Sequence, residues 1–343
     1  MPQAFLNCRV FLGSLTNVGN KPFRRLCKDY GAPATISEMV ISHYAAKGGA
    51  QDLALMRKHE SETIFGVQIE GSQINKILDT AKRAEEYGAS FIDFNAACPH
   101  ASVIKHGAGA LLLTKPEKLR QILLALRETV KLPITLKMRK GYKKSDTNTI
   151  EIAKMAEEVG VSAVFLHARS KEVQYKGDND WEIIEECAKS LAIPLIACGD
   201  LAHGPDVIER MQNSACAGFA IARGALQKPW IFKEIQEEKL LDPSAEERLE
   251  MLKTLVRYTL ENFGDDARGR HNSRNFLHKQ LAFLTRYVPV GAIGYPVPMQ
   301  ERPDSWTPRN ELEELWSKQG EENYDKLLNL ADFPSQNEAI TQV

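Results

Sequence analysis

The feature that most constrains the fold is an alternation that repeats eight times along the first 240 residues of this 343-residue chain. Short apolar runs alternate with longer amphipathic segments, which is typical of strand–helix repeats in a parallel sheet. The runs span residues 10–13, 34–38, 64–69, 90–95, 134–138, 163–167, 194–197 and 217–221. Eight repeats favour a closed (β/α)8 TIM barrel. The alternative, an open doubly wound sheet, is expected to carry a Gly-x-Gly-x-x-Gly turn, and none follows any run.

Between the apolar runs, segments 71–88, 115–130 and 149–159 show apolar residues at helical spacing. After residue 240 the pattern becomes helical only, with 246–263 and 272–287 as the clearest helices and 310–330 as a third. The proline-rich piece 295–308 predicts a loop, and the last ten residues show no periodicity. The sequence therefore predicts two domains, a barrel over 1–240 and an all-α helical domain over 241–343.

One helix of the second domain carries both an apolar stripe and basic side chains. Within 274–288 the stripe consists of Leu277, Leu281, Leu284 and Val288. Lys279 and Arg286 lie on the opposite face, and Arg274 and His278 flank the stripe. The stripe predicts core packing, whereas the basic residues fit either a solvated face or a surface that binds a polyanion.

The composition limits the kinds of partner that the chain is expected to bind. The chain has 44 basic and 45 acidic residues, so a nucleic acid would have to be held by local patches. The six cysteines include no Cys-x-x-Cys pair and no zinc-ligand spacing, which predicts neither a disulfide framework nor a metal site. No apolar run approaches the roughly 20 residues of a membrane span, and no secretory signal is recognisable. These observations predict a cytoplasmic or nuclear protein without a membrane partner.

The stretch 91–100 joins a strand pattern to a loop of small residues, and it places Asn95 and Cys98 at the carboxyl end of the fourth strand. A thiol at neutral pH is mostly protonated, so Cys98 suits a proton donor or, if activated, a nucleophile. A buried cysteine packed as a small apolar side chain is the alternative.

Polar residues end four successive strands of the predicted barrel. In such barrels the reactive groups lie on the loops that follow the strands. The residues are Gln68, Asn95, Cys98, Lys137, Arg139, His167 and Arg169. Each alone fits a satisfied structural side chain, but burying all of them without partners would cost several kcal/mol. A polar, planar ligand at the barrel mouth is the simpler interpretation.

The eighth strand runs into Ile221-Ala-Arg-Gly-Ala225. Backbone N–H groups at Gly224, where a helix starts after the last strand, are typical of the phosphate site of such barrels. Arg223 is a candidate phosphate clamp, and Gly199 with Asp200 follows the seventh strand. A phosphate cradle beside amide, Lys and His donors fits flavin mononucleotide, with Lys137 as the cation near N1.

The segment 137–144 contributes five basic residues to the same mouth. Basic loops can hold a nucleic acid by its phosphates without regard to sequence. Together with Lys105, His106 and the flanks of 274–286, this loop predicts a path for nucleic acid, although a solvated loop explains the charges equally well.

Short phrases along the chain match a known enzyme family. They are Leu15-Thr-Asn-Val-Gly-Asn-Lys-Pro-Phe-Arg-Arg-Leu26, Ser37-Glu-Met39, Phe65-Gly-Val-Gln-Ile-Glu-Gly71, Asn95-Ala-Ala-Cys-Pro99, Leu136-Lys-Met-Arg139, Leu166-His-Ala-Arg169, Gly199-Asp200, Ile221-Ala-Arg-Gly-Ala225 and Lys228-Pro-Trp230. Over nearly its whole length the chain resembles the dihydrouridine synthases, flavin enzymes that reduce uridines in transfer RNA. The segments 66–71, 246–250 and 283–291 look most similar to the eukaryotic tRNA-dihydrouridine(47) type, which acts on the variable loop. The N-terminal zinc fingers of that type have no counterpart in the cysteine pattern.

The resemblance implies a role for each candidate residue. Cys98 would be the general acid. The FMN contacts would be Gly13, Ser14, Leu15, Gln68, Lys137, His167, Gly199, Asp200, Ala222, Arg223 and Gly224. Asn95 and Lys105 would hold the target nucleotide, and the other predicted contacts with tRNA are Arg139, Lys140, Arg274, His278, Lys279 and Arg286. The implied reaction uses NADPH as reductant, brings hydride from the reduced flavin to C6 of uracil, and takes the proton for C5 from Cys98. Whether messenger RNA is also a substrate is left open.

Three positions depart from the family pattern. Ala97 stands in place of a glycine, Cys198 in place of an asparagine, and Gly13-Ser14 in place of Ala-Pro. Two other functions remain as alternatives. One is an FMN-dependent barrel acting on a free pyrimidine or enone, and the other is a barrel without flavin that binds RNA.

Overall fold

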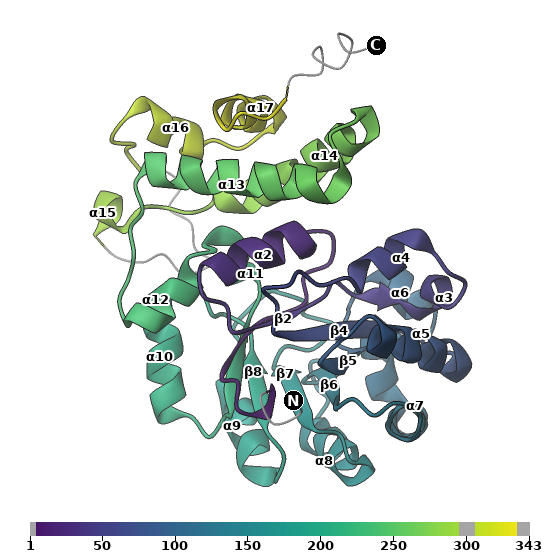
Figure 1. Ribbon diagram of the computed structural model, residues 1–343. Helices are drawn as coiled ribbons and strands as arrows, with labels where there is room; N and C mark the ends of the chain where they lie inside the picture. The colour runs from purple at the N-terminus through teal and green to yellow at the C-terminus, as the bar shows by residue number, and fades with distance from the viewer. Residues whose placement is uncertain (1–4, 295–305, 335–343) are drawn as a thin grey trace. The chain divides into compact units, whose positions relative to one another are not determined.

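The computed structural model describes residues 5–294 and 306–334 (Figure 1). The chain separates into two compact units. The first holds the described residues of Met1–Thr16 together with Ala32–Leu201 and Val207–Ala222. The second holds Asn17–Gly31, Ala202–Asp206 and the described residues of Arg223–Val343. In this division, two short segments that precede residue 222 belong to the second unit. The predicted domain boundary at residue 240 stays a prediction.

The first unit is a closed barrel of parallel strands. The strands are β1 (Val10–Leu12), β2 (Ala34–Ile36), β3 (Val40–Ile41), β4 (Ile64–Glu70), β5 (Phe91–Ala96), β6 (Ile134–Arg139), β7 (Ala163–His167), β8 (Leu195–Cys198) and β9 (Gly218–Ile221). The ring closes because β1 pairs with both β2 and β9, while β2 pairs with β4. The predicted (β/α)8 barrel is therefore confirmed. The two-residue strand β3 was not predicted; it pairs only with the end of β4.

Helices surround the strands of this unit (Figure 1). They are α3 (Ser42–Ala45), α4 (Ala50–Leu55), α5 (Ile74–Glu86), α6 (Ala101–Lys105), the 3-10 helix η1 (Gly109–Thr114), α7 (Pro116–Thr129), α8 (Thr149–Val159) and α9 (Trp181–Ser190), while α10 (Gly204–Asn213) has residues in both units. The three predicted helices are confirmed as α5, α7 and α8. Pro116 at the first position of α7 and Gly160 in the left-handed conformation after α8 mark their ends.

The amino-terminal half of the barrel is filled with apolar side chains. The rings of Phe11 and Phe165 meet edge to face with centroids 5.3 Å apart, and Phe5 stacks on Phe91. A Cβ at Gly66 would collide with the ring of Phe91, so the glycine makes room for that ring. Close packing at this end leaves the carboxyl ends of the strands for ligands.

The register carries polar side chains into the other half of the barrel. Gln68 pairs with Asp93, Asn95 with Lys137, and His167 with Cys198, on adjacent strands. Side chains two residues apart on a strand point to the same side. The inward positions therefore change from aromatic residues to amides, charges and imidazole toward the carboxyl ends.

In the described part of the chain the second unit contains helices and no strand. They are α2 (Lys21–Asp29), α11 (Arg223–Gln227), α12 (Ile231–Glu237), α13 (Ala245–Phe263), α14 (Ala267–Leu284), α15 (Val290–Ile293), α16 (Glu311–Ser317) and α17 (Glu321–Leu330). Ser244 and Glu247 form a capping box at the start of α13, and Asp266 caps α14. The helix predicted over 310–330 is interrupted, because Gly320 has a φ of 116° and starts α17 anew. Most of the predicted loop 295–308 and of the last ten residues lies outside the described residues.

The apolar stripe on and after α14 is buried, as predicted, at Leu277, Leu281, Leu284 and Val288. A buried ion pair supports the start of the unit: Lys228 Nζ lies 2.9 Å from both oxygens of Glu234 and 3.1 Å from Nδ1 of His203. Removing one partner would leave a buried charge without compensation, which is strongly destabilising. Lys228, part of a family phrase, therefore has a structural role here.

Three general expectations can be compared with the fold. All six cysteines are free thiols. Within residues 5–294 and 306–334, no three His, Cys, Asp or Glu side chains gather closely enough to hold a metal ion. No described helix is both long and apolar enough to cross a membrane.

Candidate active site

The loop that carries Cys98 is fixed by hydrogen bonds to its backbone. The side-chain oxygen of Asn95 accepts the N–H groups of Ala97 and Cys98 at 3.0 and 2.9 Å. The Cys98 carbonyl accepts the N–H of Ala110 at 3.0 Å. Its side chain packs against a small apolar cluster of Met39, Val103 and Ala108. The position of the thiol is therefore set by the end of β5 and by η1, and not by the thiol itself.

Arg139 supports the same loop from behind. Its Nε donates to the Ala97 carbonyl at 2.8 Å, and its Nη1 donates to the carbonyls of Ser170 and Gln174 at 3.1 and 2.7 Å. The side chain is 2% exposed, and burial lowers the pKa of its guanidinium. The RNA contact predicted for Arg139 stays a prediction, and this placement adds a structural role to it.

A chain of buried hydrogen bonds runs from β6 to the Cys98 loop. Thr135 donates to one oxygen of Asp93 at 2.6 Å, and the Gln68 amide donates to the other at 2.7 Å. The Asn95 amide then donates to the Gln68 oxygen at 2.8 Å. Because a carboxylate only accepts, Asp93 orients Gln68, which in turn orients Asn95 toward the N–H of Cys98. Among the described residues the second N–H of the Gln68 amide has no hydrogen-bond partner.

Two carboxyl groups at this end of the barrel were missed by the sequence reasoning. Burial raises the pKa of Asp93 to about 6, against the hydrogen bonds from Thr135 and Gln68. Burial, with a smaller contribution from Asp52, raises the pKa of Glu70 to about 7. Their signal in the sequence was position: each lies two residues from a predicted site residue on the same strand, and so on the same face.

The thiol of Cys98 is held in its neutral form. Burial raises its pKa, and the Glu70 carboxylate adds to the shift. The backbone N–H of His100 and the positive charges of Arg139 and Lys137 act in the opposite direction without reversing it. A thiol in this environment is a proton donor and a poor nucleophile.

Alkylation of the folded protein tests this directly. Iodoacetamide reacts with the thiolate, so the rate of Cys98 alkylation should rise with a midpoint above the ordinary thiol value of 9.0. The other five cysteines are buried, so Cys98 should dominate the fast phase. The Cys98→Ala variant, followed by mass spectrometry over the same pH series, is the control and should lose that phase. A midpoint below 8 would contradict the assignment of a neutral thiol.

Beside Cys98, the loops after β7 and β8 are joined around Gly199. Arg169 binds the Asp200 carboxylate through both terminal nitrogens, at 3.0 and 2.6 Å. Asn179, also missed by the sequence reasoning, donates its side-chain amide to the Cys198 carbonyl at 3.1 Å. Gly199 has a φ of 108°, and a Cβ there would come within 3.0 Å of Asn179. An amide is therefore present beside Cys198, supplied from another loop, where the family pattern has asparagine in the chain itself.

The sequence of the chain matches a known protein family. The model of the dihydrouridine synthase family (Dus) matches residues 14–282, most of the chain. The chain belongs to the dihydrouridine synthase family. This confirms the resemblance described above.

Curated relatives of this chain have more specific names. The chain is 37% identical to a tRNA-dihydrouridine(47) synthase [NAD(P)(+)] of Cryptococcus neoformans over 323 residues, 89% of this chain and 45% of the relative. It is 37% identical to the human tRNA-dihydrouridine(47) synthase [NAD(P)(+)]-like protein over 316 residues, 91% of this chain and 48% of the relative. The chain spans about half the length of these relatives.

Solved structures with little sequence similarity share the fold. The old yellow enzyme homologue from Zymomonas mobilis aligns over 71% of this chain and 92% of its own chain, with a TM-score of 0.51 and 12% identity. At that identity the likeness supports the barrel architecture alone.

The side chains at the barrel mouth fit a flavin. Lys137 points inward and, in the described part of the chain, has no hydrogen-bond or ion-pair partner. Gln68 keeps one amide N–H, and the buried side-chain oxygen of Asn179 has no partner. An ammonium, an amide donor and an amide acceptor suit the polar edge and ribityl hydroxyls of FMN. His167, 8% exposed, lies next to them with its Nε2 3.4 Å from the Arg169 guanidinium.

The remaining predicted FMN contacts are placed as follows. The Gly13 N–H donates to the Ile221 carbonyl at 2.8 Å and so is not available to a phosphate. Leu15 is buried and Ser14 half-buried. Arg223 and Gly224 form the first turn of α11, in the second unit, directly after Ala222 at the end of the first. Their contact with FMN stays a prediction.

The predicted RNA contacts of the chain differ in how their charges are balanced. Lys105 is exposed at the end of α6, whereas Lys140 pairs with Asp180 at 2.6 Å. In the second unit, Arg274 and His278 both bind Asp325, at 2.6 and 2.8 Å. The exposed predicted contacts of that unit are Lys279 and Arg286. Lys279 and Arg286 therefore offer more uncompensated charge to an RNA than Arg274 and His278 do.

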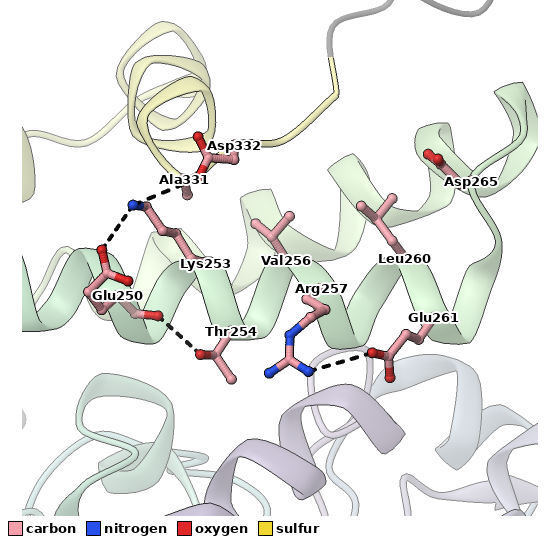
Figure 2. Close-up of a pocket in the computed structure, with 10 residues that line it drawn as sticks. All are labelled: Glu250, Lys253, Thr254, Val256, Arg257, Leu260, Glu261, Asp265, Ala331 and Asp332. Atoms are coloured by element: carbon pink, nitrogen blue, oxygen red, sulfur yellow. Dashed lines mark hydrogen bonds and ion pairs between the residues drawn. The ribbon is translucent and has the colours of Figure 1, made fainter.

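The helical unit also contains a cavity of about 650 Å³ that no sequence pattern indicated (Figure 2). Lys253 in its wall contacts Glu250 at 2.9 Å and Asp332 at 3.7 Å, and Arg257 lies 3.8 Å from Glu261. The lining contains four carboxylates and two basic side chains, so its net charge is negative. This does not suit a polyanion, and the cavity is not a candidate site for RNA phosphates.

Proposed function

We propose that this dihydrouridine synthase reduces the C5–C6 double bond of uridine in tRNA, with FMN as cofactor and NADPH as reductant. The observation that carries the proposal is the neutral Cys98 thiol, fixed through Asn95 at the mouth of the barrel. The names of the relatives support tRNA as substrate and position 47, in the variable loop, as the target. We leave messenger RNA open as a further substrate.

Bound FMN would supply hydride to C6 of the uracil ring. Cys98 gives its proton to C5, where negative charge develops, and general acid catalysis of this kind contributes about 10² to 10⁴ in rate. Asn95 orients the loop through its side-chain oxygen, and Gln68 holds Asn95 in the required orientation. The target base has to leave its stack to come close to the thiol, which costs a few kcal/mol.

Two alternatives remain to be tested against this proposal. An FMN-dependent barrel acting on a free pyrimidine or enone would reduce free uridine as well as it reduces a transcript. A barrel without flavin that binds RNA would stay colourless. The recognition of tRNA by the helical unit distinguishes the main proposal from the first alternative.

The decisive experiment uses the purified protein, FMN, NADPH and a tRNA transcript. We expect flavin absorbance near 450 nm and a mass increase of about 2 Da in one uridine, since two hydrogens are added. Protein that gains no flavin absorbance when FMN is added would overturn both enzyme proposals. Reduction of free uridine in preference to the transcript would favour the free-pyrimidine enzyme. NADPH and NADH are compared in the same assay to test the choice of reductant.

The location is proposed from the free cysteines and from the proposed substrate. We place the protein in the cytoplasm or the nucleus, because its six cysteines are free thiols and tRNA is found in both compartments. Microscopy of a tagged chain in its own cell tests this proposal.

A further prediction concerns the exposed basic face of the helical unit. Replacing Lys279 and Arg286 together with Ala should raise the Kd for tRNA by about tenfold, because each phosphate contact adds to the salt-dependent part of affinity. NADPH oxidation without RNA should not change. The matched control is Lys318→Ala with Lys326→Ala, since both lysines are exposed but paired with Glu314 and Glu322. An unchanged Kd in the first variant would mean that this face is merely solvated.

A further inference from the structure

A group of basic side chains surrounds His43 on the barrel unit. Lys76 Nζ lies 2.7 Å from Nδ1 of His43, and Lys47 Nζ lies 3.3 Å from Nε2. His106, at the end of α6, adds to the positive potential at His43, and the exposed Lys105 precedes it in the chain. We call these five residues the His43 cluster.

The His43 cluster lies at the carboxyl ends of the strands, on the same side of the barrel as Cys98. His43 is in α3, which follows β3 directly, and β3 pairs with the last residues of β4. Lys76 is in the first turn of α5, after β4. The loop between β4 and α5 is tied to α6 by the Ser72 hydroxyl, which donates to the His106 carbonyl at 2.7 Å. The helix α6 follows the Cys98 loop itself.

The charges of the cluster have no internal compensation. Both ring nitrogens of His43 face an ammonium group, yet a neutral imidazole can accept at only one of them. The ammonium of Lys47, then that of Lys76, lowers the pKa of His43. In the described ranges no member of the cluster is paired with a carboxylate, in contrast to Lys140, which binds Asp180. The neighbouring acid, Asp52 on α4, accepts the Ile41 N–H instead.

An anion would relieve this repulsion. Phosphate oxygens can accept from the two ammonium groups, and their charge would favour protonated His43. The cluster is spread over three helices and is exposed to solvent at His43, Lys47 and Lys105. Such a spread suits a row of backbone phosphates better than a single small anion.

We propose that the His43 cluster binds the phosphate backbone of the RNA substrate beside the Cys98 loop. The inference rests on the proposed function, which supplies RNA as the substrate. The same phosphate chemistry exists in the 2′-phosphate of NADPH, and the two sources predict different defects.

The test is the double variant Lys47→Ala, Lys76→Ala in the holoenzyme. For a tRNA transcript at 0.1 M salt we expect Kd to rise about tenfold, and the slope of log Kd against log[salt] to fall by about 1.5 to 2. The matched control is Lys82→Ala, Lys154→Ala. Lys82 lies further along α5 and Lys154 on α8; both are exposed, and the control removes the same charge. It should bind tRNA as the wild type does.

Each result has one interpretation. A double variant that binds tRNA like the wild type overturns the inference. A KM that rises for NADPH but not for NADH, with unchanged tRNA binding, also overturns it, because the cluster would then hold the cofactor phosphate. Wild-type protein that binds tRNA but reduces no uridine would contradict the proposed function, while the Kd of the variant would still decide the inference.

Discussion

Changing Cys98 to alanine is expected to abolish uridine reduction and to leave the flavin bound. The thiol is the proton donor for C5 in the proposed reaction, and loss of a general acid costs about 10² to 10⁴ in rate. The side chain contacts Met39, Val103 and Ala108, and within the described residues the hydrogen bond that it accepts comes from the His100 backbone. The fold and the flavin site should therefore persist. Single-turnover reduction of a tRNA transcript by pre-reduced protein measures the loss.

The controls separate the thiol from its surroundings. Cys98→Ser keeps a hydroxyl that is a weaker acid than a thiol, so an intermediate rate is expected. Cys216→Ala removes a buried cysteine elsewhere in the barrel unit and should leave the rate unchanged. A Cys98→Ala protein that loses its yellow colour, or keeps wild-type turnover, would show that Cys98 is not the acid.

The second large effect is expected from Gln68→Leu. This change removes the hydrogen-bond partner of one Asp93 oxygen and of the Asn95 amide N–H, and both residues are buried. A buried polar group without a partner costs about 1 to 3 kcal/mol, so the free energy of unfolding should fall by about 2 to 6 kcal/mol. The FMN Kd should rise as well, because leucine has no amide N–H to donate to the ligand. Urea unfolding and FMN titration measure the two quantities.

An exposed glutamine provides the matched control. Gln121 lies on α7, exposed, with only a 3.3 Å contact to Glu117. Gln121→Leu should change the free energy of unfolding by less than about 0.5 kcal/mol. If Gln68→Leu were as stable as this control, the chain of hydrogen bonds from Thr135 to Cys98 would have no structural importance.

The barrel was predictable because its strands are buried and parallel, and such strands appear in a sequence as short apolar runs. Each of the eight runs overlaps one strand of the barrel to within one or two residues at either end. The helix over 149–159 was predicted to the residue, since Gly160 supplies a left-handed end. The strand β3 was missed because two residues carry no periodicity.

The candidate site residues that lie at strand ends were predictable from the sequence. Gln68, Asn95 and Lys137 do meet on adjacent strands, because parity along a strand places them on one face. Asn179 could not be found in this way. It reaches Cys198 from a loop, and the position of a loop depends on long-range packing rather than on periodicity. The pairing of Arg274 with Asp325 depends likewise on two helices far apart in the chain.

The unusual Ala97 illustrates the same distinction. A glycine in the family pattern would tolerate a left-handed backbone at this position, in which alanine is strained, but Ala97 is not among the described residues with positive φ. Gly109 meets that requirement instead, with a φ of 59°, and a Cβ there would come within 2.6 Å of the Cys98 carbonyl oxygen. Gly109→Ala would therefore displace the loop of the thiol.

The pairing of Phe11 with Ala220 has a consequence for how the protein is made. The strand β1 cannot complete its pairing until β9 has been synthesised, because β9 lies between β8 and β1 in the sheet. On a ribosome adding about 5 to 20 residues per second, the edge of β1 stays open for about ten seconds or more and that of β8 for about 1 to 5 seconds. Open strand edges are templates for aggregation. A nascent chain of this barrel should accordingly depend on chaperones until residue 221 has emerged, and fragments that end before β9 should be insoluble.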